Sequence, residues 1–483
     1  MREAIPVKIS NVILDQGLAT DRTVANKIIG KCSVRVSPSG YFSALFLLTF
    51  TAGFLNHLGF VWSGLIAASV AWAIIPMLFW FDRVEFDGKN LTRKGAMALV
   101  RGVFNSTPHR LKIADIEHVE TQSLWSLKNG GRVYYRYQSE VSGGGMTFSF
   151  ASGGKSYRQM VKTLFSLVPE EKLDARSIEL RDFLVEPKEL ERKIKKLKLP
   201  SSDILDSTLP KLKRSTFRRD SLKILYQIEE TAEVSSYKAV ELRQAANELR
   251  VAGNLSQAIE AFRRALLWQP ENAWLLYEFA RGLFSYANAA KNAAWSRRAA
   301  AALRLAAKRG KQDAALLTRI GESYFQSGNF DLAAKVFRQT LQIQEENFRA
   351  ECGLGEIGLQ DGKIAHVVYH FQAAVRSAGD SATRRWAQTE AEYFSLLNDN
   401  LDYMETEVSR ISWLGSVSRG KRICLRLTFI NLPVILAGTF ADETIAALGW
   451  AMTAATASAW AFLTFAESFL DSRSNPSDVL EDE

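Results

Sequence analysis

Cysteine and histidine are scarce in this chain, which has three cysteines and five histidines among 483 residues. The cysteines, Cys32, Cys352 and Cys424, form no C-x-x-C motif, which excludes a zinc ribbon and a disulfide-held scaffold. His366 and His370 have the spacing of a helical zinc site, but no glutamate lies between them and no third ligand is apparent. We therefore interpret them as ordinary helix residues and predict no metal.

Recognisable catalytic motifs are also missing. There is no G-x-S-x-G sequence and no glycine-rich dinucleotide loop. The stretch Ser152–Ser156 resembles a phosphate-binding loop, but Ser149 stands where a Walker A loop needs glycine. The sequence predicts a protein that is not an enzyme and that binds no cofactor.

Residues 41–81 contain no aspartate, glutamate, lysine or arginine. One membrane span needs about 20 apolar residues and two spans with a tight turn need about 40, so this stretch predicts a transmembrane hairpin. Its centre has turn-forming residues at Asn56 and Gly59, and Pro76 is expected to kink the second helix. The alternative is a buried hairpin of a soluble domain, but such a hairpin normally carries a polar stripe.

A second apolar stretch, residues 423–466, predicts another hairpin with an acidic turn at Asp442 and Glu443. Lysine and arginine precede both hairpins and are absent from both turns. Because positively charged flanks stay in the cytoplasm, the N-terminal segment 1–40, the middle of the chain and the acidic tail 467–483 are all predicted to be cytoplasmic. We expect a multi-pass protein of a bacterial inner membrane, without a cleaved signal peptide.

Residues 82–185 change to a period-two pattern typical of short strands, closed by a helical stretch at Tyr157–Val168. The opening hairpin turns at Asp87–Gly88. This segment resembles the bacterial pleckstrin-homology-like domains that follow a two-helix membrane hairpin. The resemblance implies a small β platform for protein or lipid contact, with no catalytic residues.

The next segment, 186–235, is a basic linker that begins with a short amphipathic helix. Cationic residues beside a bilayer gain about 1 kcal/mol each near anionic headgroups. We expect membrane-surface contact from Lys193, Lys195, Lys196 and Lys198. A solvated helix face is the alternative, and nucleic-acid binding is not expected because no aromatic residues are interleaved there to stack on bases.

Residues 236–410 contain an internal repeat. Gly321, Gly328 and Phe337 recur 34 residues later as Gly355, Gly362 and Phe371. An earlier copy, with Ala246, Gly253 and Phe262, lies 75 residues before the first set, which is two periods plus seven residues. We therefore predict a second, degenerate repeat between them, with an insertion around 288–295, and capping helices after residue 383.

This pattern is identified as that of the tetratricopeptide-repeat family. The resemblance implies a solenoid of helix pairs with a concave, peptide-binding surface. Repeat phase assigns six residues to that surface: Arg243, Asn247, Arg250, Arg281, Arg319 and Arg349. Arg243 and Asn247 stand where carboxylate-clamp members carry lysine and asparagine, whereas Glu278 replaces an expected asparagine. Guanidinium groups favour acidic ligands, and a solvated charged face is the alternative.

Together these features predict an α+β membrane protein with two transmembrane hairpins, a PH-like β domain and an α-solenoid. We expect a scaffold that recruits proteins or acidic peptides to the inner membrane, and the acidic C-terminal tail is one candidate ligand of the groove. An accessory subunit of an envelope export or polysaccharide-synthesis complex is the second hypothesis. An enzyme with an unfamiliar site in the β domain is the third.

Overall fold

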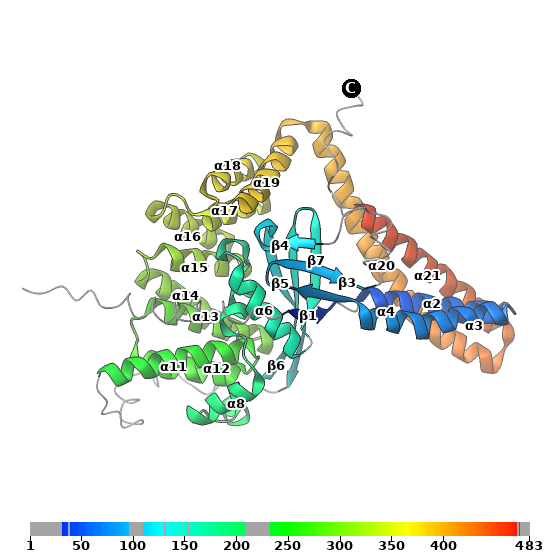
Figure 1. Ribbon diagram of the computed structural model, residues 1–483, viewed down its shortest axis with the longest axis horizontal. Helices are drawn as coiled ribbons and strands as arrows, with labels where there is room; N and C mark the ends of the chain where they lie inside the picture. Colours follow the sequence, from blue (N-terminus) through cyan, green and yellow to red (C-terminus); the bar gives the residue numbers. More distant parts are fainter. Residues whose placement is uncertain are drawn as a thin grey trace, which may run out of the picture.

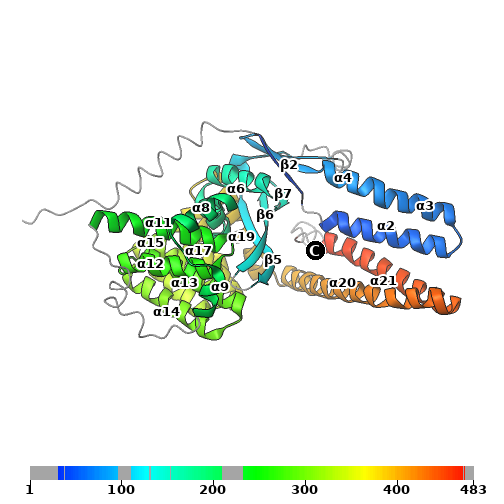
Figure 2. The same cartoon turned by 90° about the horizontal axis from the view of Figure 1, so that it is seen from below.

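The computed structural model describes residues 31–36, 39–95, 110–129, 132–152, 154–208, 232–470 and Arg473. The protein is mostly helical, with a small β region at its centre (Figures 1 and 2). A curved stack of helix pairs lies on one side of the β region, and two apolar helical hairpins project from the other side.

The β region consists of two antiparallel sheets. The first has the order β1–β2–β3–β4, with strands Cys32–Arg35, Arg83–Phe86, Asn90–Lys94 and Arg110–Lys112. The second has the order β5–β6–β7, with strands His118–Asn129, Arg132–Gly143 and Met146–Ala151. A short 3₁₀ turn, η2 (Ile113–Asp115), precedes the second sheet. A bridge between Val36 and Phe150 joins the two sheets.

Helix α6 (Lys155–Leu167) closes the core of the β region. Its buried residues follow the three- and four-residue spacing of an amphipathic helix: Tyr157, Met160, Val161, Leu164 and Phe165. They pack with buried residues of both sheets, such as Phe86 and Phe148. The predicted strands and closing helix are present, and Asp87–Gly88 forms the expected turn between β2 and β3, with Gly88 at φ +89°.

Strand β1 was not predicted. It pairs with β2 from Cys32 opposite Phe86 to Arg35 opposite Arg83. The chain therefore contributes to this sheet before the first apolar hairpin and again after it. Part of the segment expected to be separate, residues 1–40, belongs to the β region, because Cys32 and Val34 are buried in its core. Residues 1–30 lie outside the described part of the chain.

The apolar helices form two hairpins. The first hairpin comprises α2 (Ser39–His57), α3 (Val61–Ser69), the π-helical turn η1 (Val70–Ile74) and α4 (Ile75–Phe81). The π turn directly precedes α4, whose second residue, Pro76, lacks the N–H that would continue the helical hydrogen-bond ladder. The second hairpin comprises α20 (Leu401–Ala441) and α21 (Glu443–Leu470).

Within the described part of the chain, three helical stretches are long and apolar enough to cross a membrane: Val61–Phe81, Leu401–Phe440 and Glu443–Glu467. Helix α2 is not among them, so two complete spanning hairpins remain a prediction. The two hairpins pack on each other, which the sequence left open. Phe50 contacts Trp450 with ring centroids 5.5 Å apart, and Gly53 leaves room for the same indole ring.

The helix pairs follow the predicted repeats. Their bounds are Ala232–Val251 and Leu255–Trp268 (α11, α12), Ala273–Ala290 and Ala293–Arg309 (α13, α14), Ala314–Gln326 and Phe330–Ile343 (α15, α16), Phe348–Gln360 and Ile364–Ser377 (α17, α18), and Ser381–Asp399 (α19). Gly253, Gly328 and Gly362 form the turns within three pairs and have φ between +70° and +85°. Helix α13 has 18 residues, whereas α15 and α17 have 13 each, so part of the predicted insertion lengthens α13.

The segment between the β region and the stack contains η3 (Glu170–Lys172), α7 (Ala175–Phe183), α8 (Pro187–Lys196) and α9 (Ser202–Thr208). Leu190 of α8 and Leu205 of α9 are buried with Leu242 of α11 and Ile259 of α12. The first part of the expected linker therefore packs on the first helix pair. Residues 209–231 lie outside the described part of the chain.

Candidate functional site

The inner face of the helical stack is occupied by the protein's own residues 170–183, which form η3 and α7. The stack curves around the β region (Figure 1), and α7 contacts α11. Five of these fourteen residues are acidic: Glu170, Glu171, Asp174, Glu179 and Asp182. All six residues predicted to line the groove take part in polar contacts: Arg250, Arg281, Arg319 and Arg349 contact residues 170–183, and Arg243 and Asn247 contact Glu278 of the stack.

Glu179 is the centre of this contact. Its carboxylate accepts a hydrogen bond from Nη1 of Arg250 at 2.9 Å and is paired with Nη2 of Arg281 at 2.7 Å. The side chains of Arg250 and Glu179 are 3% and 7% exposed. Burial alone would raise the pKa of the Glu179 carboxyl, but the surrounding guanidinium groups outweigh burial and lower that pKa to about 2. Glu179 is therefore held ionised in the interior.

A second contact joins η3 to the third and fourth helix pairs. The Arg319 guanidinium donates to the Glu170 carboxylate. Nη1 of Arg349 donates to the backbone oxygens of Glu170, at 3.0 Å, and Leu173, at 2.8 Å. Nε of Arg349 also donates to Glu322 at 2.5 Å. Although burial acts in the opposite direction, nearby arginines hold the pKa of both Glu170 and Glu322 below the usual range.

The clamp-like pair is satisfied within the stack itself. Nε of Arg243 and Nδ2 of Asn247 donate to the same oxygen of Glu278, at 2.7 and 2.9 Å. Glu278 is the residue that replaces the expected asparagine. The resemblance predicted that Arg243 and Asn247 bind the carboxylate of a ligand. In this structure they bind the carboxylate of Glu278 instead.

Contacts with the β region extend from the first helix pair to α19. The Val133 amide donates to the Gly253 oxygen at 2.9 Å, and the Tyr137 hydroxyl donates to the Val251 oxygen at 2.8 Å. At the other end the His118 ring of β5 stacks on the Trp386 ring of α19 with centroids 6.1 Å apart, and Lys172 of η3, only 3% exposed, pairs with Asp380 at 3.1 Å. The β region is therefore held at both ends of the stack.

The four lysines expected at a membrane surface divide into two groups. Nζ of Lys193 donates to Glu248 at 2.7 Å, and Nζ of Lys196 donates to Glu241 at 2.5 Å. Both partners belong to α11. Lys195 and Lys198 are exposed, the latter with φ +49°. In both views α8 lies on the far side of the β region from the apolar helices (Figures 1 and 2). Lipid contact by these lysines stays a prediction.

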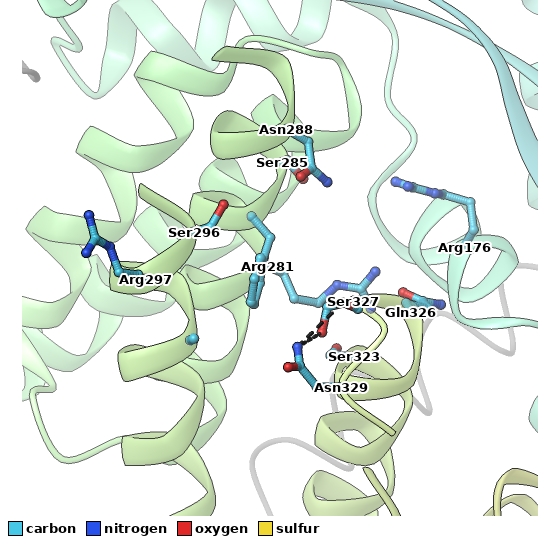
Figure 3. Close-up of a pocket in the computed structure, with 12 residues that line it drawn as sticks. Arg176, Arg281, Ser285, Asn288, Ser296, Arg297, Ser323, Gln326, Ser327 and Asn329 are labelled. Atoms are coloured by element: carbon cyan, nitrogen blue, oxygen red, sulfur yellow. Dashed lines mark hydrogen bonds between the residues drawn. The ribbon is translucent and has the colours of Figure 1, made fainter. Parts of the chain in front are cut away.

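A pocket of about 530 Å³ lies beside the Glu179 contact, between α7, α13, α14 and α15 (Figure 3). Arg176 of α7 and Arg281 of α13 approach it from different parts of the chain. Ser323 of α15 also lines it, and the Oγ atom of Ser323 is buried and has no hydrogen-bond partner among the described residues. The arrangement provides donors for a ligand that carries acceptor oxygens.

Sequence reasoning missed the acidic side of these contacts. It found the arginines but looked for their ligand in the C-terminal tail, of which residues 474–483 lie outside the described part of the chain. The density of acidic residues between 170 and 182 was the available signal. What it could not reveal is that Glu179 of α7 lies beside Arg250 of α11, 71 positions further along the chain.

In the described residues no cluster of three or more histidine, cysteine, aspartate or glutamate side chains could hold a metal ion. Nδ1 of His370 contacts the Glu351 carboxylate at 2.7 Å. His370 therefore has a partner within the repeat stack.

No protein-family model and no curated protein matches this chain. Among solved structures, the crystal structure of MamA is 19% identical in sequence and has a TM-score of 0.25. The match covers 29% of this chain and 77% of the MamA chain. The MamA RS-1 ArsTM double mutant is 15% identical and has a TM-score of 0.25, and the match covers 38% of this chain and 94% of the mutant chain. A chain of the APC/C hetero-tetramer Cut9–Hcn1 is 12% identical and has a TM-score of 0.28, and the match covers 65% of this chain and 52% of that chain. At TM-scores this low, the likenesses support no statement about function.

Proposed function

We propose that this protein is a membrane-anchored adaptor that binds acidic protein segments through the arginine-lined face of a tetratricopeptide-type stack. The observation that carries the proposal is the pairing of Arg250, Arg281 and Arg319 with carboxylates from residues 170–179. These arginines already bind an acidic segment in cis. An acidic partner would use the same chemistry in trans.

The cis contact then limits access to the stack. A partner must displace η3 from Arg319 and Arg349 before it can engage them. The η3 end is the weaker point, because the Glu170 side chain is 52% exposed whereas that of Glu179 is 7% exposed. An exposed ion pair contributes little to stability, so exchange of one carboxylate for another there costs little.

The membrane part of the proposal rests on the apolar helices. Two of the three candidate spans form one hairpin, α20 and α21, and Arg419, Lys421, Arg422 and Arg426 lie near the middle of α20, before its apolar C-terminal part. We propose that both hairpins are embedded and that the soluble regions face the cytoplasm. The four-strand and three-strand sheets with a closing helix support a PH-like platform between membrane and stack.

Binding is tested with a labelled peptide, residues 474–483 of this chain, and detergent-purified protein that lacks those residues. Fluorescence anisotropy should give weaker binding for Arg319→Gln, by about tenfold, because a charge-assisted hydrogen bond is lost. Glu170→Gln should bind more tightly, because Arg319 loses its cis carboxylate. Glu345→Gln, an exposed residue outside the site, is the matched control.

Equal affinity of wild type, Arg319→Gln and Glu170→Gln would overturn the proposal. Weaker peptide binding by the full-length chain than by the truncated one would identify the tail as a cis competitor. Sidedness needs a separate measurement. In a variant without native cysteines, Glu443→Cys in the turn of the second hairpin should react with an impermeant maleimide on intact cells, and Gln360→Cys in the stack should react only after lysis.

A further inference from the structure

The pocket between α7, α13, α14 and α15 is shaped by the longer second helix pair. Helix α13 has 18 residues, five more than α15 with 13. Helix α14 has 17 residues, whereas α16 has 14. Asn288 near the end of α13 and Ser296 near the start of α14 line the pocket (Figure 3). The turn between α15 and α16 forms the facing wall with Asn329. The pocket therefore arises where this chain departs from its own 34-residue period.

Positive charge exceeds negative charge beside this pocket. Three guanidinium groups, those of Arg176, Arg250 and Arg281, share the single carboxylate of Glu179, which leaves an excess of two positive charges. The distance from Arg176 to Glu179 is 3.4 Å, the longest of the three. Figure 3 shows the Arg176 and Arg281 side chains approaching each other at the pocket. A bound anion would reduce this imbalance.

An unsatisfied donor points to the same place. Ser323 is 6% exposed, and its Oγ has no hydrogen-bond partner within the described part of the chain. A buried hydroxyl without a hydrogen-bond partner lowers the stability of the folded protein by about 1–3 kcal/mol, so such a group normally binds a ligand or an ordered water. Ser323 lines the pocket together with Arg281. An oxyanion bound by both residues would accept a hydrogen bond from the Ser323 hydroxyl and offset the positive charge of Arg281.

We propose that this pocket binds a small organic anion through a carboxylate or phosphate group held by Arg176, Arg281 and Ser323. The volume of about 530 Å³ lies in the usual range for small-molecule sites and exceeds what a single oxyanion needs. Phe284 supplies an apolar surface for the rest of the ligand.

A small ligand fits better than an extended peptide. Helix α7 bounds one side of the pocket, and the Glu179 contacts hold α7 against the stack. An extended chain would need a continuous groove, whereas this inner face is filled by residues 170–183. Because Arg176 belongs to α7 and Arg281 to the stack, the bound anion would also hold these two parts together.

The test uses the detergent-purified full-length protein, with inorganic phosphate and succinate as probes at constant ionic strength. Isothermal titration calorimetry should show saturable one-to-one binding of at least one probe. Phosphate binding alone identifies a phosphate-bearing ligand, and succinate binding alone identifies a carboxylate. Ser323→Ala should weaken that binding about tenfold without lowering the thermal unfolding midpoint, because the free protein gives this hydroxyl no partner among the described residues.

Arg176→Lys keeps the charge but removes the planar fork, and it should weaken binding by a similar factor. Arg338→Gln, an exposed arginine of α16 outside the pocket, is the matched control and should bind as wild type does. The proposal is overturned if neither probe binds. It is also overturned if Ser323→Ala and Arg176→Lys bind as tightly as wild type, because the anion would then lie elsewhere.

Discussion

Nη1 of Arg250 and Oε2 of Glu179 lie 2.9 Å apart although 71 residues separate them in the chain. Arg250 belongs to the first helix of the stack and Glu179 to α7. Both side chains are more than nine-tenths buried. Taking two ions out of water is costly unless each is fully paired, so this contact fixes the position of α7 rather than adding much net stability.

Glu179→Gln should be strongly destabilising. The variant keeps the shape of the side chain but leaves Arg250 and Arg281 buried without their anionic partner. Breaking a buried pair on one side costs about 3–5 kcal/mol. Amide hydrogen exchange of detergent-purified protein should show faster exchange throughout α7 and in the facing turns of α11. Glu345→Gln, with an exposed side chain, should leave both helices unchanged.

The contact between α7 and the stack should weaken in acid. The pKa of Glu179 is lowered from 4.5 to about 2, so its stabilising contribution is fully present above about pH 4.5 and is lost as the pH falls toward 2. That difference corresponds to about 3 kcal/mol at neutral pH. The pKa values of Glu170, Glu322 and Asp380 are also lowered and act in the same direction.

Amide hydrogen exchange of α7 provides a local readout of this acid response, because Glu179 belongs to that helix. After correction for the intrinsic pH dependence, exchange in α7 should become faster between about pH 4.5 and 3 before global unfolding. In Glu179→Gln the change should be smaller, because the amide that replaces the carboxyl does not titrate. An acid transition of the same size in wild type and variant would contradict the role given to Glu179.

The stack could be predicted from sequence because each helix pair repeats a local pattern. The turn glycines and the aromatic positions recur every 34 residues, and Phe337 packs where Gly321 and Gly353 leave room. The arginines of the inner face follow from the same phase. Their partners do not, because α7 and the stack are joined by contacts between residues distant in the chain. No period in the sequence links Glu179 to Arg250.

Strand β1 illustrates the same limit. Four residues between a polar segment and an apolar hairpin carry too little pattern to predict a strand, and their partner β2 lies beyond the hairpin. Only the pairing across the hairpin reveals that Cys32 and Val34 complete the core of the β region. The first hairpin is therefore inserted between two adjacent strands of one sheet.

This insertion predicts a structural role for Asp82, which follows α4 and is fully buried. Nε of Arg93 donates to its carboxylate at 3.0 Å, and the Tyr41 hydroxyl of α2 donates to it as well. Asp82→Ala should remove the link between hairpin and sheet and cost about 3 kcal/mol, measured as a lower thermal unfolding midpoint in detergent. Asp361→Ala, an exposed carboxylate in a repeat turn, is the control. Equal midpoints would show that the hairpin is held by other contacts.

Gly253 and Gly328 occupy equivalent turns of the first and third helix pairs, so they form a matched pair for measuring how tightly the stack holds the β region. Both have positive φ, +85° and +75°, and alanine at either position costs about 1 kcal/mol of backbone strain. An added Cβ at Gly328 meets no described atom within 4 Å. At Gly253 it would lie 1.8 Å from the Val133 oxygen of β6.

Gly253→Ala should therefore break the hydrogen bond from the Val133 amide to residue 253 and displace β6 from the stack, whereas Gly328→Ala should show only the shared backbone strain. Limited proteolysis and hydrogen exchange of β6 would measure the displacement, and the difference between the two thermal midpoints would isolate it from the strain. If both variants lower the midpoint equally and leave β6 protected, the turn of the first repeat does not hold the β region. Other contacts, such as those of Tyr137 with Val251 and of His118 with Trp386, would then hold it.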